Sequence, residues 1–194
     1  MTLLSEGNNL KCIVTKDRID YDGRQIGSLW AYTLFRVQED SIVCFRGKCS
    51  IPLGHMIDLE DRIDNEKIES PDMLHFIVEH FDDNSLKLAY TRQRLLACIT
   101  EEVLKDVGLY VKRSGDDLFY KEEKLSISIA SASPVSHKIH FGINVRCDEY
   151  MSLEKMGIKD PVTLMGEIGR RYAAEFEDIE KAIRKARPLE VYLP

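Results

Sequence analysis

Hydrophobic and polar positions alternate most regularly between residues 124 and 145, which read KLSISIASASPVSHKIHFGINV. Apolar residues recur at every second position in both halves of this stretch, and this period of two predicts a pair of half-buried antiparallel strands. Ser133, Pro134 and Ser136 supply turn chemistry between the halves. The pattern therefore predicts a β-hairpin. Its buried face would consist of Leu125, Ile127, Ile129, Ile139, Phe141, Ile143 and Val145.

The opposite face of the hairpin carries small side chains where a solvent-exposed strand usually carries long polar ones. Small residues let a ligand lie close to a sheet, and a few polar groups fix its orientation. We interpret this face as the floor of an open cavity, and the alternative is a helix that packs tightly against the small residues. The expected floor consists of Lys124, Ser126, Ser128, Ala130, Lys138, His140, Gly142 and Asn144.

The other segments predict further strands and a few helices. Apolar runs of strand length occupy 10–15, 41–45 and 72–81, a hairpin turn falls at 114–117, helical spacing covers 27–37 and 85–107, and 52–70 is a polar connection. A last helix is expected to start at Asp160-Pro161 and to end at Arg187-Pro188, and residues 1–9 are expected to fray. This order indicates an α+β fold with a mostly antiparallel mixed sheet and flanking helices, and 1–194 as a single domain.

Basic and aromatic residues outside the hairpin supply further candidates. Arg46, Gly47 and Lys48 directly follow a predicted strand. Glycine lets backbone approach a ligand and the two cations offer charge, so this segment predicts an anion-binding turn or, alternatively, a solvated one. Arg92 lies near the start of a predicted helix, where it would clamp a carboxylate or phosphate or simply face solvent. Trp30 is interpreted as a core residue or a ligand platform.

His75, Glu79 and His80 lie in the apolar run at 72–81 and raise the question of a metal site. Their spacing is H-x-x-x-E-H, which matches neither the zincin motif H-E-x-x-H nor its inverse H-x-x-E-H. On a strand, His75 and Glu79 share a face and His80 points away from it. We therefore expect hydrogen-bonded buried histidine here, and no metal.

Charge and cysteine usage narrow the classes of function. The net charge is −6, and no basic block is interleaved with aromatic residues, so non-specific nucleic-acid binding is not expected. The five cysteines are odd in number and form no C-x-x-C pair, which argues against a disulfide framework and a structural zinc site. No signal peptide and no apolar run approaching about 20 residues is present, so a cytoplasmic protein is expected.

The segments KLSISIAS and HFGINV also carry a family resemblance. They resemble the core of the biotin and lipoate protein ligases, in which a strand-borne lysine precedes small residues and a Gly-Ile-Asn-Val-type strand follows. Over most of its length the chain is similar to an uncharacterised, mainly archaeal family that stands beside those ligases by fold. The resemblance implies a class II synthetase-like fold and an acyl-ligase or acyltransferase that acts on a small carboxylic acid.

The resemblance also implies roles for individual residues. Lys124 would be the catalytic cation beside the reacting carboxylate, because such reactions depend on positive charge at the acyl and phosphate oxygens. Arg46 and Lys48 would hold phosphate or carboxylate oxygens, and Asn144 and His140 would offer hydrogen bonds. The expected ligand-binding residues are Trp30, Arg46, Gly47, Lys48, Arg92, Ser126, Ser128, His140, Gly142 and Asn144.

ATP and magnesium are the cofactors that the resemblance implies. The Arg- and Gly-rich loop that closes over an adenylate in the ligases is, however, shortened here to Arg46-Gly47-Lys48, and no acidic pair marks a magnesium site. The expected partners are a small carboxylic acid and an acceptor protein, with a homodimer left open and no membrane. The alternatives are a non-catalytic ligand- or nucleotide-binding module and, less favoured at this net charge, a tRNA-linked accessory protein.

Overall fold

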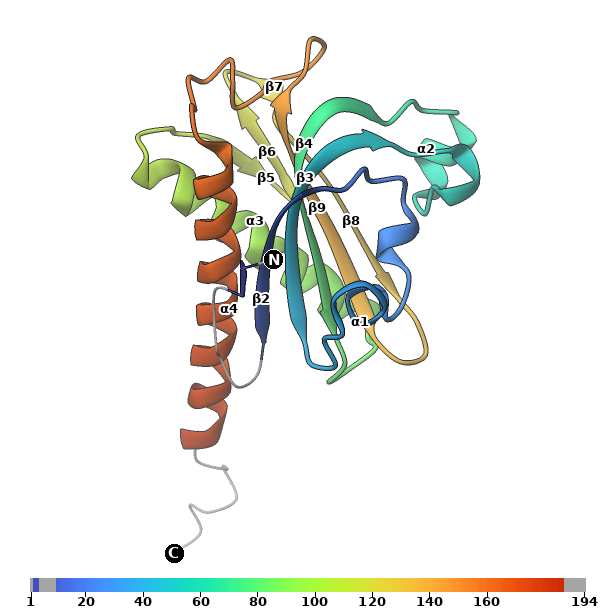
Figure 1. Cartoon of the computed structure of the whole chain (residues 1–194), viewed down its shortest axis with the longest axis vertical. Helices are drawn as coiled ribbons and strands as arrows, with labels where there is room; N and C mark the ends of the chain where they lie inside the picture. The colour runs from blue at the N-terminus through green and yellow to red at the C-terminus, as the bar shows by residue number, and fades with distance from the viewer. Residues whose placement is uncertain (1, 4–9, 187–194) are drawn as a thin grey trace, which may run out of the picture.

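A six-stranded sheet organises the computed structural model, which describes residues 2–3 and 10–186 (Figure 1). The strand order is β1-β2-β3-β4-β9-β8, and every neighbouring pair is antiparallel except β2 with β3. The strands are β1 (Thr2–Leu3), β2 (Lys11–Arg18), β3 (Ser41–Ser50), β4 (Glu69–His80), β8 (Ser126–Ala132) and β9 (His137–Arg146). The expected mostly antiparallel α+β fold is therefore confirmed.

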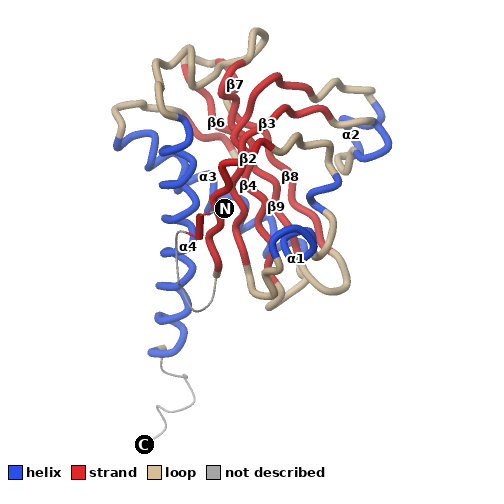
Figure 2. Tube along the Cα trace, viewed as in Figure 1, coloured by secondary structure: helices blue, strands red, loops and turns tan. Residues whose placement is uncertain are grey.

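Two long helices cover one face of this sheet, and short helical segments lie over the other (Figures 1 and 2). The long ones are α3 (Leu86–Asp106) and α4 (Pro161–Lys185); the short ones are η1 (Arg24–Ile26), α1 (Trp30–Phe35), η2 (Leu53–His55) and α2 (Leu59–Ile63). A small second sheet is formed by β5 (Lys112–Ser114), β6 (Asp117–Tyr120) and β7 (Glu123–Lys124). We call the side of the main sheet that carries α1 and α2 the open face.

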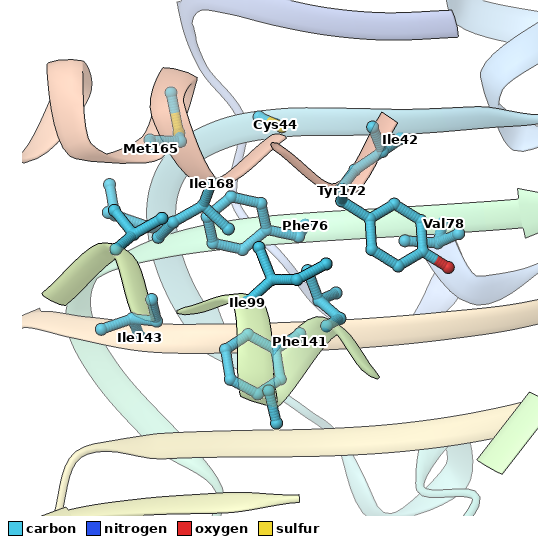
Figure 3. Packing of buried hydrophobic residues seen from close by; sticks show 14 of the residues in the cluster. Ile42, Cys44, Phe76, Val78, Ile99, Phe141, Ile143, Met165, Ile168 and Tyr172 are labelled. Carbon is cyan, nitrogen blue, oxygen red and sulfur yellow. The ribbon is translucent and has the colours of Figure 1, made fainter. Parts of the chain in front are cut away.

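The main core fills the space between the sheet and the two long helices (Figure 3). Leu96, Ile99 and Val103 of α3 recur at helical spacing and are buried against the strands. The α4 helix approaches closely at Gly169, where a Cβ atom would lie 2.6 Å from Cys44 Sγ. The apolar stripes of both helices are thus buried against the sheet. The open face is therefore the side of the sheet on which a ligand site can lie.

Local sequence signals explain where these helices begin. Ser85 Oγ accepts a hydrogen bond from Leu88 N at the start of α3, and the Asp160 carboxylate accepts one from Thr163 N at the start of α4. Both are side-chain caps that satisfy free amide groups of the first turn. The predicted start of the last helix is confirmed. Its expected end at Arg187-Pro188, and most of the expected frayed segment 1–9, lie outside the described residues.

The apolar run at 72–81 forms β4, the strand between β3 and β9, as predicted. Alternation along this strand puts His75 and Glu79 on the open face, whereas His80 packs against Phe176 of α4. The prediction that His80 points away from the other two is therefore confirmed. It places two buried polar side chains on the face that carries the candidate site.

The predicted turn at Arg46-Gly47-Lys48 is wrong, because all three residues lie inside β3. Gly47 is required there by packing: a Cβ atom on it would lie 1.9 Å from the carbonyl oxygen of Ile19, on the segment that crosses the strand. The glycine that suggested an approaching ligand instead admits the backbone of the protein itself.

The β8–β9 hairpin is confirmed, but the predicted faces of its first strand are wrong. In an antiparallel pair, residues that lie opposite each other share a face. Ile127 lies opposite Gly142, and Ser128 lies opposite Phe141. Consequently Ile127 and Ile129 belong to the open face with His140, whereas Ser126 and Ser128 point toward the helix-covered core.

Replacing Gly47 with alanine should destabilise the protein. The added methyl group would collide with fixed backbone, and such overpacking costs about 1–3 kcal/mol or more. The matched control is Gly54→Ala, where a Cβ atom would meet nothing within 4 Å; this change should stay within about 0.5 kcal/mol. Urea unfolding of the two variants measures the difference, and equal stabilities would contradict the packing described for β3.

Candidate functional site: a pocket on the open face

A cavity of about 360 Å³ opens between the segment that carries α2 and the strands β8 and β9. Its apolar lining comes largely from four isoleucines and Met73. Three of these residues, Met73, Ile127 and Ile129, stand on the sheet itself. The isoleucines and the methionine are Ile51, Ile68, Met73, Ile127 and Ile129, and Cys49 and Tyr150 also line the cavity. A pocket of this kind can remove the hydrocarbon part of a small ligand from water.

The polar lining of the pocket is mainly acidic. Five carboxylate residues and two lysines line it: Glu60, Asp61, Asp64, Glu66, Glu69, Lys67 and Lys124. Burial raises the pKa of Asp61, the Asp58 carboxylate adds to the rise, and the charge of Lys124 opposes it. The α2 segment therefore brings negative charge close to Lys124. A highly charged anion such as a nucleoside triphosphate would meet repulsion at this rim.

Lys124 reaches the pocket from the end of β7. Its backbone is held by the pairing of β7 with β6 and by a hydrogen bond from Met151 N to the Lys124 carbonyl. Its Nζ lies 3.0 Å from Asp117 Oδ2, and its side chain is 39% exposed. An ammonium group has three N–H donors. The Asp117 ion pair holds the amine in place and leaves N–H donors available, so Lys124 can still bind an anionic group in the pocket.

His140 lines the pocket from β9 and is part of a buried ring stack. Its imidazole lies parallel to the Tyr21 ring at a centroid distance of 3.7 Å, and its Nε2 is 3.0 Å from Nδ1 of His75. Burial lowers the pKa of His140 well below its usual value, and the neighbouring His75 lowers it further. Burial also lowers the pKa of His75, to about 3. Both rings are therefore neutral near pH 7, which confirms the expected hydrogen-bonded buried histidine.

Asn144 also borders the pocket, and its side chain has a structural task there. Its Nδ2 donates to the backbone carbonyl of Met151, and the Asn144 backbone carbonyl accepts from Leu153 N. These bonds hold the loop after β9 against the end of the hairpin. Asn144 thus helps to place the loop whose Met151 amide holds the Lys124 carbonyl.

Ser126 and Ser128 border the pocket, but their hydroxyl groups are used elsewhere. Ser126 Oγ accepts a hydrogen bond from Leu118 N, and Ser128 Oγ bonds to Gln93 of α3 and to the carbonyl of His140. Gly142 is not an open floor, because a Cβ atom there would lie 2.7 Å from the terminal carbon of Met73. The expected floor of small residues is therefore wrong, and on the sheet side the cavity is faced mainly by Ile127, Ile129 and Met73.

Arg46, Gly47 and Lys48 do not line the pocket. The Arg46 guanidinium is hydrogen-bonded to both carboxylate oxygens of Asp72, which also pairs with Arg18 at 2.9 Å. Burial alone would raise the pKa of Asp72, but the hydrogen bonds from Arg46 and Arg18 outweigh it and hold the pKa below its usual value. Arg46 is thus committed to an internal ion pair.

Arg92 and Trp30 also lie away from the pocket. Arg92 is on the helix-covered side, where it pairs with Asp82 and lies over the Phe176 ring at 4.7 Å. Trp30 packs edge-on against Phe35 in the smaller apolar cluster of the open face. The predicted candidates that the structure brings together are Lys124, Ser126, Ser128, His140 and Asn144.

Among the described residues, one group has oxygen and nitrogen atoms close enough to share a metal ion: Asp40, His80 and Asp82. The atoms that would bind the metal already have hydrogen-bond or ion-pair partners. His80 Nδ1 is 2.8 Å from Asp40, His80 Nε2 is 2.9 Å from the Tyr172 hydroxyl, and Asp82 is held by Arg92. The arginine charge beside Asp82 also opposes a cation. This group does not suit magnesium, and it lies on the helix-covered side, away from the pocket.

The comparison with known proteins identifies the family. Residues 10–187 match the model of a domain of unknown function, DUF366. The chain belongs to this family. An uncharacterised protein of Methanocaldococcus jannaschii, MJ0805, is 45% identical over 190 residues, covering 93% of this chain and 86% of that protein. The solved structure of a protein of unknown function from Pyrococcus horikoshi is 38% identical with a TM-score of 0.89, covering 93% of this chain and 100% of that chain.

The fold of this chain is also similar to that of solved biotin and lipoate protein ligases. The biotin acetyl coenzyme A carboxylase synthetase of Helicobacter pylori, solved with biotinylated ATP, has a TM-score of 0.56 at 12% identity, covering 91% of this chain and 81% of that chain. The expected likeness to the biotin and lipoate protein ligases in fold is therefore confirmed. Among the described residues no helix has the length and apolar character that a bilayer crossing requires.

Asp72→Asn should lower the free energy of unfolding by about 2 kcal/mol at pH 7, since hydrogen bonds to charged groups contribute on this scale. The folded pKa of Asp72 is depressed, so its contribution is complete above the ordinary pKa of about 3.9 and is lost as the pH falls through the folded value. Urea unfolding at pH 7, 5 and 3 measures this dependence.

The control is Asp22→Asn, which breaks an exposed pair with Arg24 and should have little effect on stability. A loss of stability in Asp72→Asn that persisted unchanged at pH 3 would refute this assignment.

Proposed function

We propose that this protein binds a small carboxylic acid in the open-face pocket, as part of an acyl-ligase or acyltransferase reaction. The carboxylate lies at Lys124, and the hydrocarbon body lies over Ile127, Ile129 and Met73. One observation carries this proposal: a lysine with free donor capacity stands at the edge of a cavity whose sheet side carries Met73, Ile127 and Ile129. Burying apolar surface stabilises such a complex by about 25 cal/mol per Å².

The arrangement suits chemistry at the acyl carbon. When a carboxylate is activated or transferred, negative charge collects on its oxygens, and a fixed cation lowers the barrier. Asp117 fixes the Lys124 amine at 3.0 Å, so little reorganisation is needed when a substrate arrives. The H. pylori relative with biotinylated ATP supports an activated acyl group as the product of such a site. ATP, magnesium and an acceptor protein are part of this proposal.

The second candidate is a non-catalytic binding module on the same fold. Two observations favour it: Arg46 is bound to Asp72 instead of facing a nucleotide, and the rim is acidic. Both would weaken binding of ATP while leaving the apolar part of the pocket intact. We propose a cytoplasmic location for either function, which the five free cysteines support.

Lys124→Met should weaken binding of small carboxylic acids, because methionine keeps the apolar length of the side chain and removes its charge. The matched control is Lys67→Met, which removes an exposed lysine that lines the same pocket and pairs with Glu69. Isothermal titration with octanoic acid, biotin and lipoic acid measures the effect. We expect at least a tenfold higher Kd for Lys124→Met, about 1.4 kcal/mol, and near wild-type binding for Lys67→Met. Equal affinities in all three proteins would remove Lys124 from the site.

ATP–pyrophosphate exchange separates the two candidates. The ligase proposal expects exchange that depends on an added acid and on Lys124. Acid binding without exchange, for every acid of the panel, would support the binding module. The Lys67→Met variant again serves as the control that keeps the pocket and the fold.

A further inference from the structure

Most of the carboxylates that line the pocket have no partner in the protein. Of the five, Glu69 is paired with Lys67 at 3.3 Å. The other pocket lysine, Lys124, is paired with Asp117, which is not part of the lining. The pocket therefore holds negative charge that the protein does not neutralise. In the described part of the chain, no hydrogen bond or ion pair reaches the side chains of Glu60, Asp61, Asp64 and Glu66.

Asp61 differs from the other three because it is half-buried, whereas they are exposed and can be solvated by water. It lines the pocket and also a smaller cavity of about 40 Å³ that shares Ile129 with it. Burial, followed by the charges of Asp58 and other nearby carboxylates, raises the pKa of Asp61. A charge that is withdrawn from water and left without a partner is unfavourable. A positive group that entered the pocket would relieve this situation.

The pocket carboxylates are not arranged to share a metal ion. Within the described residues, the group whose ligand atoms lie within 4.8 Å of one another is Asp40, His80 and Asp82, on the helix-covered side. A divalent cation needs several oxygen ligands at one point. An ammonium group needs a single carboxylate to form a charge-assisted hydrogen bond. The pocket charge therefore suits an organic cation better than a metal ion.

The sheet side of the pocket offers a further sign of a ligand. His140 is only 1% exposed, and its Nε2 is bound to His75 Nδ1, but no hydrogen bond from the described residues reaches its Nδ1. The fully buried side-chain nitrogens and oxygens without a partner are Ser41 Oγ and His75 Nε2 there. His140 Nδ1 is therefore open to the cavity that this residue lines. Whichever ring nitrogen holds the proton, a largely buried polar atom without a protein partner calls for a group from outside the chain.

Lys124 and Asp61 lie within reach of one small molecule. Both line the same cavity of about 360 Å³, Lys124 from β7 and Asp61 from α2. The charge of Lys124 acts on Asp61, and between partly exposed groups such an effect is screened beyond about 10 Å. The sheet side of the cavity carries Ile127 and Ile129. The pocket thus combines a cation, an anion without a partner and an apolar surface.

We propose that the pocket selects carboxylic acids that also carry an ammonium group: the carboxylate binds Lys124, the ammonium group binds Asp61, and the hydrocarbon lies over Ile127 and Ile129. The inference deepens the proposed function and rests on the carboxylate lying at Lys124. It follows from charge complementarity. A simple carboxylate adds negative charge to a pocket that already has an excess, whereas a zwitterion adds none.

Matched eight-carbon acids test this selectivity by isothermal titration at pH 7. 2-Aminooctanoic and 8-aminooctanoic acids are compared with 2-hydroxyoctanoic and 8-hydroxyoctanoic acids, which have nearly the same size and lack the positive charge. We expect at least one amino acid to bind the wild type about tenfold tighter than its hydroxy partner, since hydrogen bonds between charged groups contribute on this scale. The pair that shows the preference tells which end of the ligand lies at Asp61. Equal affinities within both pairs would overturn the proposal.

Asp61→Asn removes the charge and keeps the size of the side chain. The preference for the amino acid should disappear in this variant, while octanoic acid should bind at least as tightly as to the wild type because the repulsion is smaller. The matched control is Glu102→Gln, which removes an exposed carboxylate from α3 on the helix-covered side and should keep the preference. A preference that persisted in Asp61→Asn would remove Asp61 from the site.

The outcomes separate this inference from the function on which it rests. If no acid binds the wild type, both fail. If amino and hydroxy acids bind equally and depend on Lys124, the carboxylate site stands and the ammonium selectivity is refuted. If the amino acids bind more tightly but Lys124→Met weakens none of the acids, the carboxylate site fails and the cation subsite at Asp61 remains. If Asp61→Asn does not fold, the amino-to-hydroxy ratio of the wild type still decides.

Discussion

The antiparallel register between β4 and β9, two central strands of the sheet, is the constraint on which the rest of the structure depends. It sets His75 opposite Gly142 and Ile77 opposite His140, and every such pair commits its side chains to one face. One face therefore collects Phe76 and Phe141 for the core under the long helices. The other collects the two histidines below the pocket. A shift of one residue would exchange these faces and destroy both.

Saturated charge networks occupy basic residues on both faces of the sheet. Arg46, which lies opposite Leu74 of the main core, is bound to Asp72. On the open face, the buried Lys138 amine lies 2.8 Å from Ser28 Oγ and 3.8 Å from Glu79, whose carboxylate also accepts from Leu29 N. Buried charges persist only when they are paired and hydrogen-bonded. These two cations hold the fold together, whereas Lys124 at the end of β7 is a partly exposed pocket lysine that a ligand anion can reach.

Local pattern was enough to predict the strands, the long helices and the hairpin, because their periodicity and caps are short-range signals. Which residues of each strand face the core was harder to predict, since this depends on how the strand pairs with its neighbours. A loop of four residues joins Ala132 to His137 and pairs odd-numbered residues of β8 with even-numbered ones of β9. Counting across that loop would have moved Ile127 and Ile129 to the open face. The crossing of Ile19 over Gly47, and the Arg46–Asp72 pair, join residues far apart in sequence and gave no local signal.

The central claim, that a small carboxylic acid lies in the open-face pocket with its carboxyl end at Lys124, is tested most directly by crystallography with 8-bromooctanoic acid. Anomalous scattering locates the bromine independently of any model of the ligand. The account predicts a bromine peak near Ile129 and His140, with the carboxylate at the Lys124 amine. A bromine peak beside Arg46 and Lys48, on the helix-covered side, or at Lys124 itself would contradict it.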